Sequence, residues 1–308
     1  GDELRDTRFI VQPSMDPDSP NFRSLVAADP EFIRGSFWPD GMIRVSGREY
    51  NGLIDSPCYQ RGTMSCLSCH AMHKPADDPR DLETWANDQL RARMDGNHAC
   101  LQCHQQMTDQ VTAHTHHAAD STGSKCYNCH MPHTTYGLLK AIRSHQIDSP
   151  TVQASLNTGR PNACNQCHLD KSLAWSAHHL EQWYGISAPA LNRDQQEMAA
   201  SLLWMLSGDA GQRALMAWSM GWEPARQASG RDWMAPFLAL LLNDPYDAVR
   251  FIANRSIRTL PGLDSVAYDF LSSRDARGGL RPYLQAWLKQ PRSEFPLPVH
   301  NAAIAKIR

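Results

Sequence analysis

The pattern Cys-x-x-Cys-His occurs four times in this 308-residue chain, and it constrains the fold more than any other feature of the sequence. The first to fourth motifs read CLSCH, CLQCH, CYNCH and CNQCH. Their cysteines are Cys66, Cys69, Cys100, Cys103, Cys126, Cys129, Cys164 and Cys167, eight of the nine in the chain. A segment that carries four such similar sites so close together has little sequence left for an ordinary apolar core.

Three kinds of site use a Cys-x-x-Cys spacing: a zinc knuckle, a redox-active disulfide and a covalently attached haem. Zinc sites need four ligands, usually from two knuckles, and have no need for a histidine directly after the second cysteine. A thioredoxin-like motif would follow a strand in a βαβ unit, and no such pattern surrounds these copies. The fourfold repetition with histidine in the same place therefore predicts four c-type haems.

In this interpretation two residues between the thiols let both sulfurs reach the two vinyl groups at one porphyrin edge, and the next residue turns its imidazole under the iron. The predicted proximal ligands are His70, His104, His130 and His168. Because thioether bonds hold the haem, a deep apolar pocket is not required, and the four haems themselves are expected to form the core of this segment.

The ligand on the far side of each iron decides its chemistry, since a second histidine generally gives a low-potential electron carrier and an open site permits substrate binding. The densest group of remaining histidines is His114, His116 and His117 in HTHH, and we expect two of these three to bind iron. His73 and His145 are further candidates, with His145 expected on a helix, and His133 is a weaker one. We expect His98, His178, His179 and His300 to be structural or exposed.

Composition changes near residue 170, and three regions are predicted. Residues 1–57 read as an extended arm, 58–170 as the haem domain with short helices such as 82–94, and 171–308 as an α-helical domain. The last region has no cysteine and seven of the nine tryptophans, and its apolar residues recur at helical intervals. There Asp244 is expected to cap a helix that begins at Pro245. The predicted fold is mainly α, with HEAT-like helix pairs or a plain bundle at the end.

The charge balance gives no sign of a nucleic-acid partner or an anionic membrane, because the formal net charge is only −2 and no long run of one sign occurs. No apolar run approaches the roughly 18 residues of a membrane span. The chain begins at Gly1 without a starting methionine, which favours a mature exported protein or a fragment. Covalent haem attachment normally happens outside the cytoplasm, so we expect the periplasm or the cell surface. The ninth cysteine, Cys58, is expected to be a buried free thiol, although a reactive or chain-linking role is the alternative.

Several stretches together resemble the superfamily of cytochrome c554 and pentahaem nitrite reductase, over roughly residues 36–185. They are SGREYNG, SPCYQRGTMSCLSCHAMH, THH, GSKCYNCHMPHTTYGLL, RSHQI and RPNACNQCHLDKSLAW. The resemblance implies haems packed in stacked and perpendicular pairs, mostly with two histidines per iron. It implies His73, His116, His117 and His145 as distal ligands. Nitrite reductases of this superfamily have lysine in place of the proximal histidine at the catalytic haem, whereas all four motifs here end in histidine, which argues against nitrite reduction.

The expected function is electron transfer by outer-sphere hopping along four closely spaced haems, with the helical region for docking or assembly. One alternative is a reductase of a small nitrogen or sulfur oxyanion, with one open haem near a positive side chain such as Arg143 or Lys140. Another is a structural, electron-conducting subunit of a redox complex or cytochrome filament. The expected partners are other redox proteins or copies of the chain itself.

Overall fold

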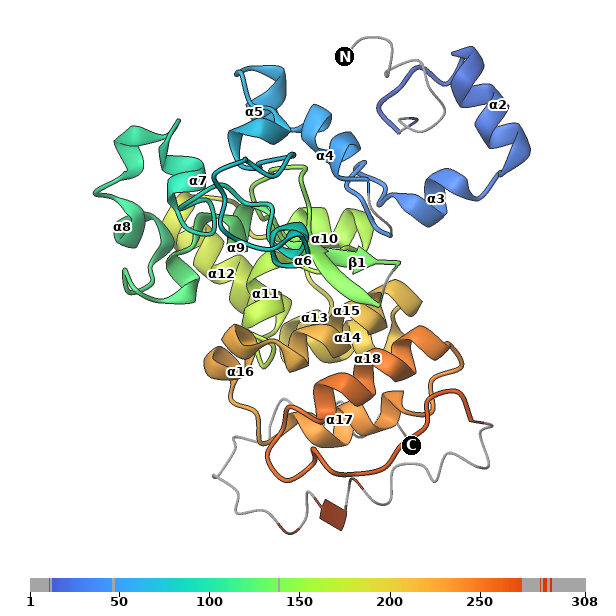
Figure 1. The fold of residues 1–308 in the computed structure, drawn as a ribbon. Coiled ribbons are helices and arrows are strands. Elements are labelled where there is room, and N and C mark those ends of the chain that lie inside the picture. Colours follow the sequence, from blue (N-terminus) through green and yellow to red (C-terminus); the bar gives the residue numbers. More distant parts are fainter. Residues whose placement is uncertain are drawn as a thin grey trace.

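The computed structural model describes residues 11, 13–45, 48–137 and 139–272, together with 283, 285, 286 and 289. These residues are mainly helical, which confirms the predicted fold class at that level (Figure 1). Within the same ranges, no helix has the length and apolar character needed to cross a bilayer. His300 lies outside the described residues.

The described part of residues 1–57 is not the extended arm that was predicted, because it contains short helices. They are α2 (Pro20–Ala28), α3 (Phe32–Ser36) and α4 (Glu49–Asp55). Ser19 caps α2 by accepting a hydrogen bond from the Phe22 amide, and proline occupies the first position of the helix. This region still packs on the rest of the chain, since Val45 forms an isolated parallel bridge with Thr135.

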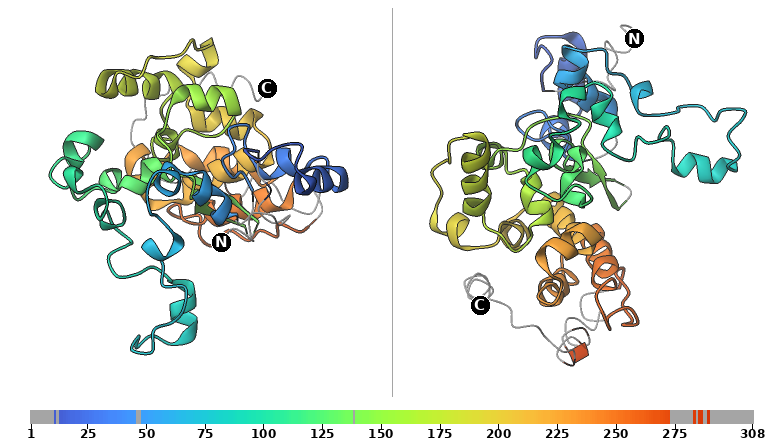
Figure 2. Two further views of the ribbon diagram at one scale, coloured as in Figure 1. Left: turned by 90° about the horizontal axis from the view of Figure 1, so that it is seen from above. Right: turned by 90° about the vertical axis from the view of Figure 1, so that its left-hand side faces the viewer.

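The region that carries the four motifs is made of short elements joined by irregular chain. Its α-helices are α5 (Pro57–Gln60), α6 (Leu82–Asn87), α7 (His98–Leu101), α8 (Val111–Thr115), α9 (Cys126–His130), α10 (Val152–Thr158) and α11 (Ala163–Cys167). Its 3-10 turns are η2 (Cys66–Ser68), η3 (Gln105–Met107) and η4 (Thr122–Ser124). The segment around α6 projects from the body in both views of Figure 2.

The helix predicted over 82–94 is wrong beyond Asn87. After α6, Leu90 forms an antiparallel bridge with His70, and the Arg91 amide donates to the Cys69 carbonyl. Arg93 then has a positive φ of 70°, which is incompatible with continuing the helix. Pairing with the first motif therefore replaces the second half of the expected helix.

The only sheet in the described ranges is antiparallel and joins β1 (His133–Tyr136) to β2 (Lys140–Arg143), with His133 opposite Arg143. His145 lies two residues after the end of β2 and outside any helix, so its expected place on a helix is wrong. The strand pairing fixes where the chain after Arg143 begins, and hence where His145 can lie.

The C-terminal region is built from helices packed side by side around one apolar core (Figure 1). They are α12 (Leu173–Tyr184), α13 (Arg193–Glu197), α14 (Ala200–Ser207), α15 (Ala210–Gly221), α16 (Glu223–Ser229), α17 (Met234–Leu241) and α18 (Asp247–Ile257). Helix α15 packs against both α14 and α18, with Met216 and Ala253 fully buried. A Cβ on Gly221 would lie 2.5 Å from the Ser256 hydroxyl, so glycine is what lets α15 and α18 approach so closely.

The predicted start of the last helix is wrong, because α18 begins at Asp247 and not at Pro245. The carboxylate of Asp244 accepts hydrogen bonds from Arg213 Nε at 2.6 Å and from Arg213 Nη2 at 3.1 Å. It also accepts one from the Tyr246 amide at 2.9 Å. The side chain of Asp244, which was expected to cap the helix, therefore forms an ion pair with Arg213 of α15 instead.

The fourth motif is attached directly to the helical region. The hydroxyl of Ser229, at the end of α16, accepts a hydrogen bond from the Leu169 amide at 2.7 Å and donates one to the Cys167 carbonyl at 2.6 Å. Leu169 is completely buried in the same apolar core as the C-terminal helices. The helical region thus supports the backbone of the fourth motif.

Candidate functional site

Three of the four motif histidines face a second histidine across a gap. In each pair the ring centres are 6.0 to 6.2 Å apart and the ring planes are within 31° of parallel. The pairs are His70 with His145 (6.2 Å, 31°), His130 with His114 (6.1 Å, 8°) and His168 with His117 (6.0 Å, 28°). The three pairs come from different parts of the chain and share one geometry.

This spacing has the size needed to hold one metal ion between two imidazoles. A metal–nitrogen bond of about 2 Å on each side, with roughly 1 Å from each nitrogen to its ring centre, spans about 6 Å. Histidines that simply pack against tryptophan lie closer: His116 is 4.2 Å from Trp183, and His133 is 4.4 Å from Trp218. Parallel rings on opposite sides of a metal do not match a tetrahedral zinc site. Among the described residues there is also no group of three or more metal-ligating side chains.

The tautomers of three of these histidines are fixed by backbone carbonyls. The Nδ1 atom of His117 is 2.6 Å from the Thr115 carbonyl oxygen, and that of His145 is 3.2 Å from the Arg143 oxygen. In His130 the acceptor is the Asp148 oxygen, at 2.8 Å. A carbonyl can only accept, so Nδ1 carries the proton and the Nε2 lone pair is free to bind a metal.

The HTHH turn presents two of its three histidines to different motifs. Helix α8 ends at Thr115, and His116 has a left-handed conformation with φ of 57°, which turns the chain between His114 and His117. His116 itself stacks on Trp183 of α12, with the rings 14° from parallel. The structure therefore places His114, and not His116, opposite a motif histidine.

The remaining predicted site histidines do not form such pairs in the described part of the chain. His73 is exposed in the loop after the first motif, and His104 of the second motif is exposed as well. Within the described ranges no imidazole faces either ring. The weaker candidate His133 lies between Trp218 and Trp222, at 4.4 and 4.7 Å, where burial holds its pKa well below the usual value.

Of the other histidines, three were expected to be structural or exposed and lie in the described residues. His98 begins α7, and His178 and His179 lie on α12, as predicted from the sequence. His179 packs between Trp175 and Trp183, at 4.4 and 4.5 Å, so it belongs to the aromatic face of that helix.

Side-chain hydrogen bonds join the motifs in the order of the sequence. Gln102 of the second motif donates to the Ser68 carbonyl of the first at 3.3 Å. Just before the second motif, the Asn97 side chain donates to the Ser124 carbonyl at 2.8 Å and accepts from the Cys126 amide at 3.0 Å.

The third and fourth motifs are joined in a similar way. The Gln166 side chain of the fourth motif exchanges two hydrogen bonds of 2.9 Å with the backbone of His133, which follows the third motif. Each motif is thus bonded to the next, or to the chain beside it, through an amide side chain.

The cysteine thiols of successive motifs also lie close together. A hydrogen bond between Cys100 and Cys126 raises the pKa of Cys100 and lowers that of Cys126 to about 7. The pKa of Cys69 is raised mainly by burial and also by the neighbouring Cys103 thiol. Burial and the neighbouring Cys129 thiol raise the pKa of Cys164 to about 12. The thiols therefore bring neighbouring motifs together in the same order, from the first to the fourth, as the side-chain hydrogen bonds do.

The ninth cysteine, Cys58, lies in the short helix α5 and is half-buried. All nine cysteines are in the described part of the chain, and none of them forms a disulfide. Burial and the nearby Cys103 thiol raise the pKa of Cys58, which keeps it protonated at neutral pH. Cys58 was expected to be a buried free thiol; it is only half-buried, and its raised pKa disfavours the reactive thiolate form.

Arg143 is hydrogen-bonded to the third motif. Its guanidinium donates to the carbonyls of Tyr127 and Met131 at 3.0 and 3.2 Å, and to the Asn128 side chain at 2.6 Å. Burial lowers the pKa of Arg143 to about 10, so the group stays charged at neutral pH. The other proposed positive side chain, Lys140, is exposed at the start of β2.

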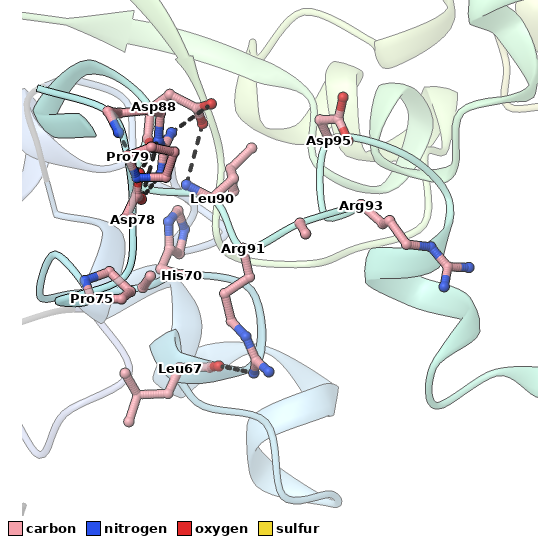
Figure 3. A pocket seen from close by; sticks show the side chains of 13 residues that line it. Leu67, His70, Pro75, Asp78, Pro79, Asp88, Leu90, Arg91, Arg93 and Asp95 are labelled. Carbon is pink, nitrogen blue, oxygen red and sulfur yellow. Dashed lines mark hydrogen bonds and ion pairs between the residues drawn. The ribbon is translucent and has the colours of Figure 1, made fainter. Parts of the chain in front are cut away.

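A cavity of about 780 Å³ lies beside the first motif, with His70 in its wall (Figure 3). Arg80 lines it and forms ion pairs with Asp78 at 2.7 Å and Asp88 at 3.3 Å, while Arg91 donates to the Leu67 carbonyl. These ion pairs leave little net charge in the wall, so the cavity does not favour a strongly anionic or cationic ligand.

Comparisons of the chain with protein-family models, with curated proteins and with solved structures found no match. The chemistry of the site is therefore inferred from its own residues.

Proposed function

We propose that the chain is a tetrahaem c-type cytochrome that transfers electrons along four covalently bound haems. The observation that carries the proposal is the set of three opposed imidazole pairs, each of which includes the histidine of a Cys-x-x-Cys-His motif and has room for one iron. When bound, each haem supplies a one-electron iron couple.

The protein residues would keep the iron ligands unchanged while an electron arrives and leaves. In the proposed assignment, His145 is the distal ligand of the first motif, His114 of the third and His117 of the fourth. The carbonyls that hold Nδ1 of His117 and His145 oppose rotation of the rings and would leave Nε2 free to bind the iron. Two neutral histidines on each of these haem irons would leave no free coordination position, which suits an electron carrier.

The hydrogen bonds between successive motifs support electron transfer in sequence order. The contacts made by Gln102, Asn97 and Gln166 hold neighbouring motifs at fixed separations, and electron hopping depends steeply on that separation. The C-terminal helices would then serve as the support of the fourth motif and as a docking surface for other redox proteins or for copies of the chain. We infer an exported location from the attachment chemistry alone.

One observation favours the alternative of a reductase. His104 of the second motif is exposed, and no described imidazole lies opposite it. A reductase of a small oxyanion needs one iron whose sixth ligand can be exchanged, and the second motif is the place to look for it. Arg143 would not serve such a site, because its guanidinium is already bound to the third motif.

The test is an electron paramagnetic resonance spectrum of the oxidised protein, with covalent haem counted by mass spectrometry. Four haems per chain, at least three of them low-spin, are expected. Fewer than three low-spin haems, or chains without covalent haem, would overturn the proposal. A high-spin fraction of one in four that binds carbon monoxide after reduction would make the reductase the better hypothesis for the second motif.

A further inference from the structure

Gly123 lies against the imidazole of His117 so closely that no side chain fits at this position. A Cβ placed on Gly123 would lie 2.2 Å from Cδ2, 2.5 Å from Cγ and 2.8 Å from Nε2 of His117. Carbon atoms do not approach each other to such distances without moving. The φ of Gly123 is not in the left-handed region, so the backbone itself does not require glycine.

Both partners of this contact are fixed in place. The ring of His117 is held through Nδ1 by the Thr115 carbonyl, at 2.6 Å. Next to Gly123, the buried Ser124 hydroxyl shares its one proton between the carbonyls of His117 at 3.0 Å and Ala118 at 2.7 Å. The side-chain amide of Asn97 donates to the Ser124 carbonyl at 2.8 Å. The glycine backbone and the ring therefore cannot separate without breaking several of these bonds.

The part of the ring that lies against Gly123 is formed by Cγ, Cδ2 and Nε2, and Nε2 is the atom proposed to bind iron opposite His168. We propose that Gly123 is a positioning residue that sets the orientation of the His117 imidazole toward His168, 6.0 Å away. The inference rests on the proposed function and adds to it a residue outside the four Cys-x-x-Cys-His motifs. Any side chain at 123 would tilt the ring and move Nε2 off the line to the fourth iron.

The experiment compares Gly123→Ala with the control Gly96→Ala in the full, haem-loaded chain. Gly96 also precedes a motif, but a Cβ there would meet only the Arg93 carbonyl at an ordinary 3.8 Å. In Gly123→Ala we expect one low-spin haem per chain to become high-spin, and the reduced protein to bind one more carbon monoxide than the wild type. Gly96→Ala should match the wild type. An unchanged low-spin count in Gly123→Ala would overturn the inference.

A double variant keeps the test decisive if Gly123→Ala does not mature. His117→Ala removes the ring that an alanine at 123 would strike, so adding Gly123→Ala to His117→Ala should change neither haem content nor spin count. If the double variant fails as the single one does, Gly123 acts on the backbone and the inference is wrong. If wild-type protein lacks low-spin haems altogether, the proposed function fails and not this inference alone.

Discussion

Replacing Ser229 by alanine should weaken the attachment of the fourth motif to the helical region by about 2–4 kcal/mol. The side chain is almost fully buried, at 4% exposure, and its hydroxyl both accepts from the Leu169 amide and donates to the Cys167 carbonyl. Without the hydroxyl, the amide of the completely buried Leu169 loses its partner and has no route to water. Each buried polar group left without a hydrogen bond costs about 1–3 kcal/mol, and the Cys167 carbonyl, which is less deeply buried, should cost toward the lower figure.

The assay is denaturant unfolding at neutral pH, followed by far-ultraviolet circular dichroism and by haem absorbance. Ser207→Ala is the matched control, because Ser207 is exposed and its hydroxyl donates only to the Leu203 carbonyl within α14. The control should change the free energy of unfolding by less than about 0.5 kcal/mol. If Ser229→Ala costs no more than Ser207→Ala, the hydroxyl does not connect the two regions in the way described.

Other predictions concern charge, protonation and ligand identity. Arg143→Gln should lower the reduction potential of the nearest haem in a redox titration. A unit charge on the order of 10 Å away, at an effective dielectric constant of about 20, contributes roughly 1.7 kcal/mol, or about 70 mV. Arg143→Lys should keep most of that potential, and equal potentials in all three proteins would contradict the reasoning. Burial depresses the pKa of His133 in the folded state. As the pH drops below about 6.5, the unfolded state therefore binds a proton at this residue before the folded state does, and the free energy of unfolding should fall. His133→Phe should lose less stability than the wild type between about pH 7 and pH 5, and a parallel loss would exclude His133 as the cause. His114→Ala should convert one haem to high spin while His116→Ala leaves all spin states unchanged, and the reverse result would exchange their assigned roles.

The mainly helical class and the number of motifs could be predicted from the sequence because both depend on local patterns. The C-terminal helices follow apolar residues at helical spacing, and α12 carries His178 and His179 as expected. The predictions from sequence fail where a residue from a distant part of the chain binds the group on which the local pattern depends. Asp244 precedes a proline as a helix cap should, but Arg213 on another helix binds its carboxylate.

The pairing of the histidines could be predicted only in part. The density of the HTHH cluster predicted that two of its members bind iron, and two of them lie opposite motif histidines. Which two depends on the left-handed conformation of His116 and on its stacking against Trp183, far along the chain. No spacing rule within HTHH contains that information, and the resemblance selected His116 in place of His114.

The two sides of each proposed iron site are therefore encoded differently. On the proximal side, one prosthetic group has to meet two thiols and an imidazole, so the residues must be neighbours in sequence and form a motif. On the distal side, backbone contacts place the ring: Gly123 lies against His117, and a Cβ on Gly52 of α4 would lie 3.0 Å from the carbonyl carbon of His145. A glycine that admits a close approach looks in sequence like any other glycine. Two of the three proposed distal ligands, His117 and His145, thus share a close glycine and an Nδ1 at a backbone carbonyl, whereas within the described residues His114 is identified only by the motif ring it faces.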